Sequence, residues 1–321
     1  ASDVYKRQLK WLAICLPLGI AVGSAVAFFL WSLDRVTQAQ WQFPWLLFGL
    51  PLAGLVSGLL YHHWGRNSEA GNNLVLEQIH EPDGQGVPAR MALLVLIGTL
   101  ITHLCGGSAG REGTAVQMGG SLAGTLGRWL RLGPQETRVL LMSGVAAGFG
   151  AVFGTPLAGT VFAVEVLTRG RLSYQALLPC LIAAIVGDQA CIAWGIEHTH
   201  YAIEHVVADS PGAADSAVQL PSLDGILVAK VAIAAVFFGL ASMAFVEMTH
   251  AVTALFKRVI AIPWLRPAVG GVIVVGLVGL LGERDYLGLG VEADPADPSA
   301  VSLQSCFRVG GAEPWSWWWK M

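Results

Sequence analysis

The residues best suited to chemistry lie in one glycine-rich stretch, Gly106–Gly120, where Arg111 and Glu112 stand side by side among six glycines. Apolar segments that could enter a bilayer flank this stretch on both sides. A charged side chain at membrane depth is costly and by default marks a functional site. Glycines at this density allow backbone N–H groups to approach a ligand closely. The stretch therefore predicts a ligand site inside the membrane.

A negative ion is the ligand that this stretch favours. The residues from Thr114 onward predict a helix, and the first N–H groups of a helix have no partner within it. The helix dipole adds positive potential at the same end, so an anion is stabilised there. Irregular backbone at membrane depth is tolerated only where it lines a cavity or is buried in protein. The sequence thus predicts an anion site with the carboxylate of Glu112 beside it.

The composition is that of a membrane protein. Hydrophobic residues make up 54% of the chain and charged residues 13%, and the mean hydropathy is +0.59, well outside the range of ordinary soluble domains. Thirty-nine glycines suit membrane helices, whose backbones pack closely. The net charge of -3 gives no support for a nucleic-acid partner. The five cysteines show no paired spacing, so neither a structural disulfide nor a metal site is expected, and nothing indicates a cofactor.

Apolar runs of membrane-spanning length recur along the chain. Basic residues Lys6, Arg7 and Lys10 precede the first run and predict a cytoplasmic N-terminus. We therefore expect a multi-pass protein of the cell inner membrane, embedded in the lipid bilayer. The expected helical runs are Trp11–Leu33, Phe43–Trp64, Ala89–Cys105, Tyr174–Trp194, Leu223–Leu255 and Pro267–Leu281.

A second glycine-rich region, Ser143–Gly154, leads directly into Thr155 and Pro156. Proline suits the first turn of a helix because its missing N–H would have no partner there. One continuous helix would carry several unfavourable glycines. We therefore predict two short helices that meet at Gly154.

These two regions carry a family resemblance. Gly110-Arg111-Glu112-Gly113 followed by a helix resembles the filter motif of the CLC family of anion channels and proton-coupled antiporters. The segment 148–159 is similar to that family's next conserved block, and the resemblance extends from about Leu9 to the tail. It implies an all-α membrane protein, a bundle of tilted and broken helices with inverted-repeat topology. In such folds the broken helices aim their N-termini at a central anion.

The resemblance also implies how the chain is divided. Residues 1–196 would form the first transmembrane repeat with the anion-filter motifs, and residues 222–321 the incomplete beginning of the second. The tail from Pro314 looks like the opening of a further helix, so we expect the chain to be a fragment. The family's second filter helix and central tyrosine would then follow Met321. A homodimer is implied by the resemblance alone.

Three departures from the usual family pattern narrow the expected function. Gly71-Asn72-Asn73-Leu74-Val75 stands where most members have Gly-Ser-Gly-Ile-Pro, Thr114 replaces the proline after the filter, and Val166 occupies the place of the inner proton-transfer glutamate. The combination is similar to the fluoride-exporting branch of the family. An amide suits that chemistry, because Asn offers two N–H donors where Ser offers one O–H.

The resemblance assigns roles to individual residues. Glu112 would be the gating glutamate, whose ionised carboxylate occupies the anion's own position and whose protonation removes both its charge and its competition. Asn72, and with less support Asn73, would contact fluoride or chloride from the cytoplasmic side. The backbone amides of Gly113, Thr114 and Ala115 would complete the site.

The implied function is proton-coupled export of fluoride, a fluoride/proton antiporter. The alternative within the family is a channel or antiporter for chloride or another anion. An intramembrane enzyme with Glu112 as its acid or base is the alternative from another class. No nucleophile or metal set accompanies Glu112 at membrane depth, so we do not expect an enzyme.

Structural roles remain open for three of these residues. Glu112 could simply pair with Arg111, although neighbours in the sequence of a helix do not face each other. Asn72 and Asn73 could form an ordinary turn, because asparagine tolerates left-handed backbone.

Two other groups of polar residues have structural interpretations as well. Glu165, next to Val166, could relay protons or could be a helix-end carboxylate, and we adopt the second interpretation. His198, His200, Glu204 and His205 could bind a metal or belong to a polar external loop, and we adopt the loop.

Overall fold

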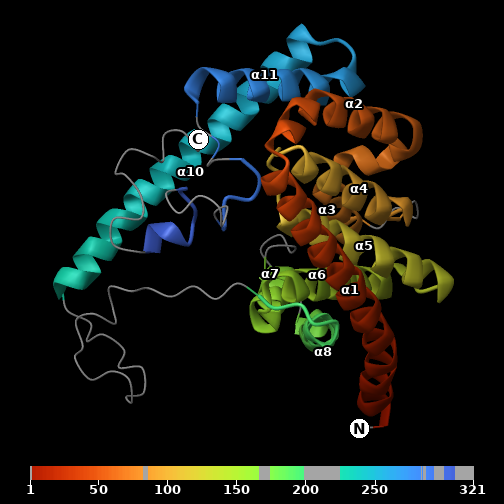
Figure 1. Ribbon diagram of the computed structural model, residues 1–321. Helices are drawn as coiled ribbons and strands as arrows, with labels where there is room; N and C mark the ends of the chain where they lie inside the picture. The colour runs from red at the N-terminus through yellow and green to blue at the C-terminus, as the bar shows by residue number, and fades with distance from the viewer. Residues whose placement is uncertain are drawn as a thin grey trace. The chain divides into compact units, whose positions relative to one another are not determined.

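The computed structural model describes residues 2–81, 86–165, 174–198, 225–282, 284, 287–292 and 300–307, and helices are the only regular elements among them (Figure 1). In chain order the elements are α1 Ser2–Gln42, η1 Pro44–Gly49, α2 Leu50–Leu60, η2 Tyr61–Gly65, η3 Arg66–Ala70, α3 Asn72–His80, α4 Arg90–Leu104, α5 Arg111–Trp129, α6 Pro134–Phe153, α7 Pro156–Glu165, α8 Tyr174–Ala193, α10 Gly225–Val259, η5 Pro263–Leu265, α11 Arg266–Leu281 and η6 Ser305–Phe307.

Within this part of the chain, six helical segments are long and apolar enough to cross a membrane. Helices α8, α10 and α11 lie close to their predicted runs. Helix α1 is longer than predicted and continues to Gln42. The predicted run Phe43–Trp64 is instead divided among η1, α2 and η2, the last a short π-helical turn. The chain is therefore an all-α, multi-pass membrane protein.

The chain divides into two compact units. The first contains Ala1–Thr199, Pro267–Leu281 and Leu287–Leu289, and the second contains His200–Arg266, Gly282–Tyr286 and Gly290–Met321. The second unit holds α10, a single helix of 35 residues. Just after it, the Arg266 Nε–H donates to the carbonyl of Ile260 at 3.1 Å. The predicted repeats at 1–196 and 222–321 are a different division and remain a prediction.

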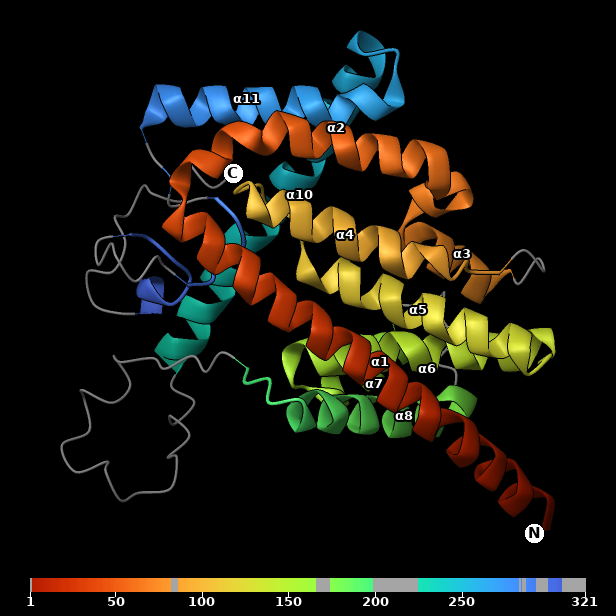
Figure 2. The ribbon, with the colours of Figure 1, turned by 45° about the vertical axis from the view of Figure 1, so that its right-hand side comes forward.

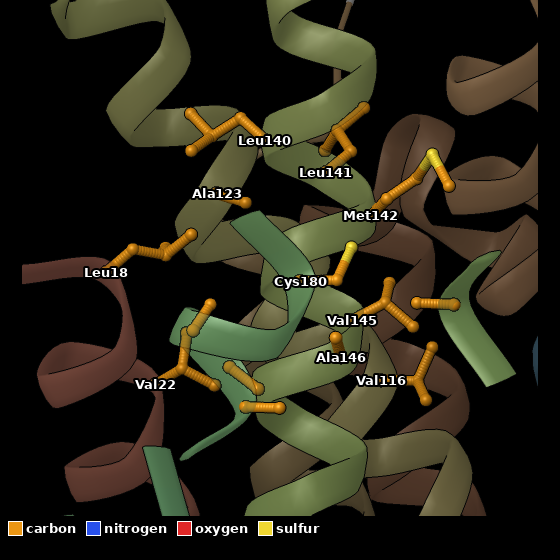
Figure 3. Close-up of a cluster of buried hydrophobic side chains, with 14 of the residues drawn as sticks. Leu18, Val22, Val116, Ala123, Leu140, Leu141, Met142, Val145, Ala146 and Cys180 are labelled. Atoms are coloured by element: carbon orange, nitrogen blue, oxygen red, sulfur yellow. The ribbon is translucent and has the colours of Figure 1, made fainter. Parts of the chain in front are cut away.

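Helix α6 is the centre of the first unit and packs against α1, α5, α7 and α8. Figure 2 shows α1 running obliquely across α4, α5, α6 and α8, in agreement with their contacts. The core between them is made of aliphatic and small side chains (Figure 3), among them Leu18 and Val22 of α1, Leu140 and Val145 of α6, and Cys180 of α8. Burying these side chains holds α1, α6 and α8 together.

Glycines let these helices touch along their backbones. A Cβ added at Gly119 of α5 would lie 2.1 Å from the carbonyl oxygen of Gly144 in α6. A Cβ added at Gly23 of α1 would lie 2.1 Å from the carbonyl oxygen of Gly187 in α8. No side chain fits at such distances, so glycine is required at both crossings, as small residues are at other membrane helix contacts.

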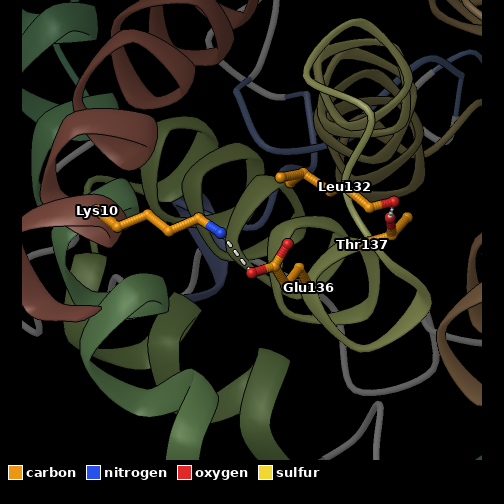
Figure 4. Close-up of polar contacts among 4 residues, drawn as sticks. All are labelled: Lys10, Leu132, Glu136 and Thr137. Carbon is orange, nitrogen blue, oxygen red and sulfur yellow. Dashed lines mark hydrogen bonds and ion pairs between the residues drawn. The ribbon is translucent and has the colours of Figure 1, made fainter. Parts of the chain in front are cut away.

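The two ends of α6 follow from local sequence. Pro134 occupies the first turn. Glu136 lies in the same turn, where its negative charge interacts favourably with the positive end of the helix dipole. Figure 4 shows the Lys10 ammonium paired with the Glu136 carboxylate, and the Thr137 hydroxyl directed at the Leu132 carbonyl 3.5 Å away. At the other end Gly154 adopts left-handed backbone with φ +67°.

Helix α7 begins two residues after Gly154, with Pro156 as its first residue. The predicted break between two helices at Gly154 is therefore confirmed, but α6 has 20 residues and is not the short helix that was predicted.

Candidate functional site

Helix α5 carries the residues predicted to do chemistry, and it begins at Arg111. The prediction that it begins at Thr114 is wrong. Gly110 is extended, with φ -70° and ψ 130°, and serves as the residue before the helix. Gly113 falls within the first turn. The Asn72 side chain lies 3.1 Å from the position that a Cβ on Gly113 would occupy, so glycine leaves room for it there. The four unpaired N–H groups of this helix end are therefore those of Gly110 to Gly113.

The Glu112 carboxylate lies at the start of its own helix. One carboxylate oxygen, Oε2, is 3.0 Å from the position that a Cβ on Gly110 would occupy. This end of a helix has positive potential, so the carboxylate occupies a place that favours an anion. The side chain is 48% exposed, and its Oε1 is 3.9 Å from Arg111 Nε. The two side chains therefore lie at ion-pair distance, but the pair is not buried, because Glu112 is exposed.

Arg111 has a second neighbour in α6. Its guanidinium carbon lies 5.6 Å from the ring centroid of Phe153, within the range of a cation–π contact. The Phe153 ring in turn packs against Phe149, with centroids 4.7 Å apart. Arg111 therefore contacts both α6 and the Glu112 carboxylate.

Thr114 and Ala115 face the interior of the unit. The Thr114 hydroxyl is 2.8 Å from the Thr99 hydroxyl of α4 and donates to the Gly110 carbonyl at 3.2 Å. Ala115 is fully buried, and its carbonyl oxygen lies 2.4 Å from where a Cβ on Gly148 would be. As the fourth and fifth helical residues, both have N–H groups that face carbonyls four residues earlier. Thr114 therefore links the start of α5 to α4, and Ala115 lies at the contact between α5 and α6.

Asn72 and Asn73 are the first two residues of α3. The left-handed turn considered for them is not formed, because the positive φ of +56° belongs to Gly71. Asn72 Nδ2 lies 3.1 Å from the position that a Cβ on Gly113 would occupy. Asn73 is exposed. The structure thus brings Asn72 to Gly113 and leaves Asn73 outside this contact.

Sequence reasoning missed one residue of this cluster, Gln117. Its Nε2 lies 3.3 Å from the Cβ position of Gly71 and 4.0 Å from that of Gly113. Gln117 follows Gly113 by four residues, so the two lie on the same face of α5. That spacing was a usable signal once a helix was expected to cover both positions.

The remaining predicted positions lie away from this cluster. Glu165 is the last residue of α7 and is exposed, as expected of a helix-end carboxylate. His198 Nε2 is 4.0 Å from Asp188 Oδ1 of α8. Among the residues that the structure describes, no three histidine, cysteine or acidic side chains are grouped to hold a metal ion. Val166, His200, Glu204 and His205 lie outside that part of the chain, as does the tail from Pro314.

Comparison with known proteins identifies the family of the chain. The family described as Voltage gated chloride channel matches residues 53–299. The "Chloride/fluoride channel protein" of Pseudomonas syringae pv. tomato is 46% identical over 319 residues, which cover 99% of this chain and 66% of that protein. The chain therefore spans just under two thirds of the length of this relative.

Two solved structures have a similar fold. A CLC-type fluoride/proton antiporter superposes with a TM-score of 0.76 and 32% sequence identity, covering 88% of this chain and 68% of the other. A slow cyanobacterial Cl-/H+ antiporter superposes with a TM-score of 0.65 and 20% sequence identity, covering 87% of this chain and 65% of the other. This second likeness shows the fold alone. With the Gly-Arg-Glu-Gly motif at the start of α5 and the family match over most of the sequence, the chain belongs to the voltage gated chloride channel family, the CLC family.

Proposed function

We propose that the protein is a fluoride/proton antiporter that exports fluoride across the cell inner membrane. The observation that carries the proposal is the meeting of two helix starts, at which Asn72 of α3 lies against Gly113 of α5, the residue that follows Glu112. Two helix N-termini favour a negative ion between them, and a side-chain amide adds direct N–H donors.

Glu112 links the ion to protons in this proposal. Its carboxylate lies at the positive end of α5, which is also where an entering anion would be stabilised. While ionised, it competes with the anion for these N–H groups. Once protonated it loses its charge and swings away, so the anion takes its place. Each anion bound thus requires a proton at Glu112, which couples the two fluxes.

Asn72 favours fluoride over chloride in this proposal. Fluoride is the smaller and more strongly hydrated ion, so the site must replace more water-to-ion hydrogen bonds. The two N–H donors of an asparagine amide replace more of them than one serine hydroxyl does. The similarity to proteins named for fluoride transport supports this choice of ion.

The roles of the remaining predicted residues follow from their positions. We assign the anion-facing backbone N–H groups to the open end of α5 up to Gly113, with Thr114 and Ala115 holding that end in place. Asn73 would contribute from the exposed side of α3 only as the ion approaches. We further propose a homodimer in the lipid bilayer, as the family resemblance implies, and a transporter with no enzymatic activity.

Anion flux from liposomes tests the proposal. The full-length protein is reconstituted, the liposomes are loaded with sodium fluoride or sodium chloride, and efflux is followed with ion-selective electrodes. We expect fluoride to leave at least roughly tenfold faster than chloride, a difference that corresponds to about 1.4 kcal/mol in the limiting step. Chloride efflux as fast as fluoride efflux would refute the fluoride assignment and favour a chloride transporter.

A further inference from the structure

We infer that Gln117 is a second side-chain amide of the anion site and shares with Asn72 the discrimination between fluoride and chloride. This inference rests on the proposed function, because it assigns a further residue to the same ion. Gln117 lies on α5, one helical turn beyond Gly113, and reaches α3 at the residue that precedes Asn72.

The positions of the two amides are set by two glycines. Asn72 Nδ2 and Gln117 Nε2 both lie within 4.0 Å of one point, the position that a Cβ on Gly113 would occupy. Gln117 Nε2 also lies 3.3 Å from the corresponding point on Gly71, whose φ of +56° favours glycine in any case. Any larger residue at Gly113 would enter the space that both amides share.

Both amides are available to a ligand. Among the residues that the structure describes, none forms a hydrogen bond with the Asn72 or the Gln117 side chain. Asn72 is exposed and Gln117 is partly buried. A partly buried amide next to a helix start normally finds a partner, because an unsatisfied donor is costly. An anion seated between the starts of α3 and α5 would accept an N–H from each amide.

Packing along the rest of this interface explains why Gln117 stays in place. Further along the same face of α5, a Cβ on Gly120 would lie 2.9 Å from the Val75 side chain of α3. The two helices therefore remain close beyond the amide pair, and Gln117 is partly buried beside this contact. Partial burial limits the number of conformations that the side chain loses when it binds an ion.

Replacement of Gln117 by methionine separates a ligand role from a packing role. Methionine keeps the length and flexibility of the side chain but has no N–H. We expect Gln117→Met to lower the initial fluoride efflux and the fluoride-to-chloride rate ratio by roughly tenfold, as for loss of one hydrogen bond to a charged group. Gln135→Met, an exposed position in the first turn of α6, is the matched control and should leave both quantities unchanged.

Three outcomes decide the inference. A reduced rate ratio at an unchanged melting temperature supports it. Equal losses of fluoride and chloride efflux, with a lower melting temperature, would assign Gln117 to packing and overturn it. If Gln117→Met does not fold, Gln117→Glu keeps the size of the side chain and replaces a donor by a negative charge. Anion efflux unchanged in Gln117→Glu would overturn the inference.

The same experiment distinguishes this inference from failure of the proposed function. If the wild type moves chloride as fast as fluoride, the fluoride assignment fails, and Gln117 is then judged by chloride efflux alone. A chloride rate reduced in Gln117→Met but not in Gln135→Met would still place Gln117 at the anion site. Equal chloride efflux in Gln117→Met and Gln135→Met would show that Gln117 is not part of the anion site.

Discussion

The two sides of α5 use glycine for opposite purposes. Toward α6, Gly119 lies so close to Gly144 that an added Cβ would be 2.1 Å from a backbone oxygen. Toward α3, the atoms nearest to the Cβ positions of Gly113 and Gly71 are the side-chain amides of Asn72 and Gln117. On one side glycine brings two backbones into contact, and on the other it makes room for polar side chains.

This difference separates stability from function within a single helix. The α6 side is a contact between backbones, so an added side chain there can be accommodated only if one of the two helices moves. The α3 side contains side-chain amides whose ends can move and whose donors are available to an ion. A change on the α6 side should therefore affect folding first, and a change on the α3 side should affect transport first.

Gly119→Ala should have the largest effect on stability. The added Cβ would meet the Gly144 carbonyl, so α5 and α6 must separate, and we expect a loss of about 3 kcal/mol or more. Thermal unfolding in detergent, followed by size-exclusion chromatography, measures it. Gly276→Ala in α11 is the control, because no atom lies within 4 Å of its Cβ position. Equal melting temperatures for the two variants would contradict the backbone contact at α6.

Asn72→Leu should abolish most transport without unfolding the protein. Leucine has a similar size but no N–H, so we expect fluoride efflux from liposomes to fall by roughly tenfold or more. Asn72→Ser restores one donor and should recover efflux while it shifts the preference toward chloride. Fluoride efflux that persists at the wild-type rate in Asn72→Leu would show that α3 does not contact the ion.

Thr114→Val should have a smaller effect, confined to stability. The variant loses the buried hydrogen bond to the Thr99 hydroxyl at 2.8 Å, which we expect to cost about 1 kcal/mol. The double variant with Thr99→Val should be less destabilised than the sum of the two single variants, because the partner is then not left unsatisfied. Additive losses in thermal unfolding would argue against this hydrogen bond.

Lys10→Met should have the smallest effect. The Lys10–Glu136 ion pair joins α1 to the first turn of α6, but both side chains are more than a third exposed. Exposed pairs of this kind contribute about 0–1 kcal/mol, and salt weakens them. At low salt we expect Lys10→Met to have a slightly lower melting temperature than the wild type. At high salt we expect the two melting temperatures to be equal. A large loss that is independent of salt would mean that this contact is part of the core.

Local features of the sequence predicted much of the fold. Apolar runs located α8, α10 and α11, and the Gly154–Pro156 pair predicted the junction of α6 and α7. These features depend on residues that are neighbours along the chain. The start of α5 was predicted three residues too late, at Thr114 instead of Arg111, so that Gly113 falls inside the first turn.

Contacts between distant segments could not be predicted in the same way. The sequence shows many glycines, but it does not show that Gly119 meets Gly144 or that Gly23 meets Gly187, because each meeting depends on how two helices cross. Asn72 was identified as a site residue only through the family resemblance. Gln117 was within reach of sequence analysis, since its spacing of four from Gly113 places it on the face that turns toward α3.

Proton movement driven by a fluoride gradient tests the central claim most directly. Wild-type protein and Glu112→Gln are reconstituted in liposomes, and the internal pH is followed after an outward fluoride gradient is imposed. We predict inward proton movement with the wild type and none above that of empty liposomes with Glu112→Gln, although the variant elutes as folded protein. Proton movement that persists in folded Glu112→Gln would contradict the account, because the carboxylate would then not be the group that shares its position with the anion.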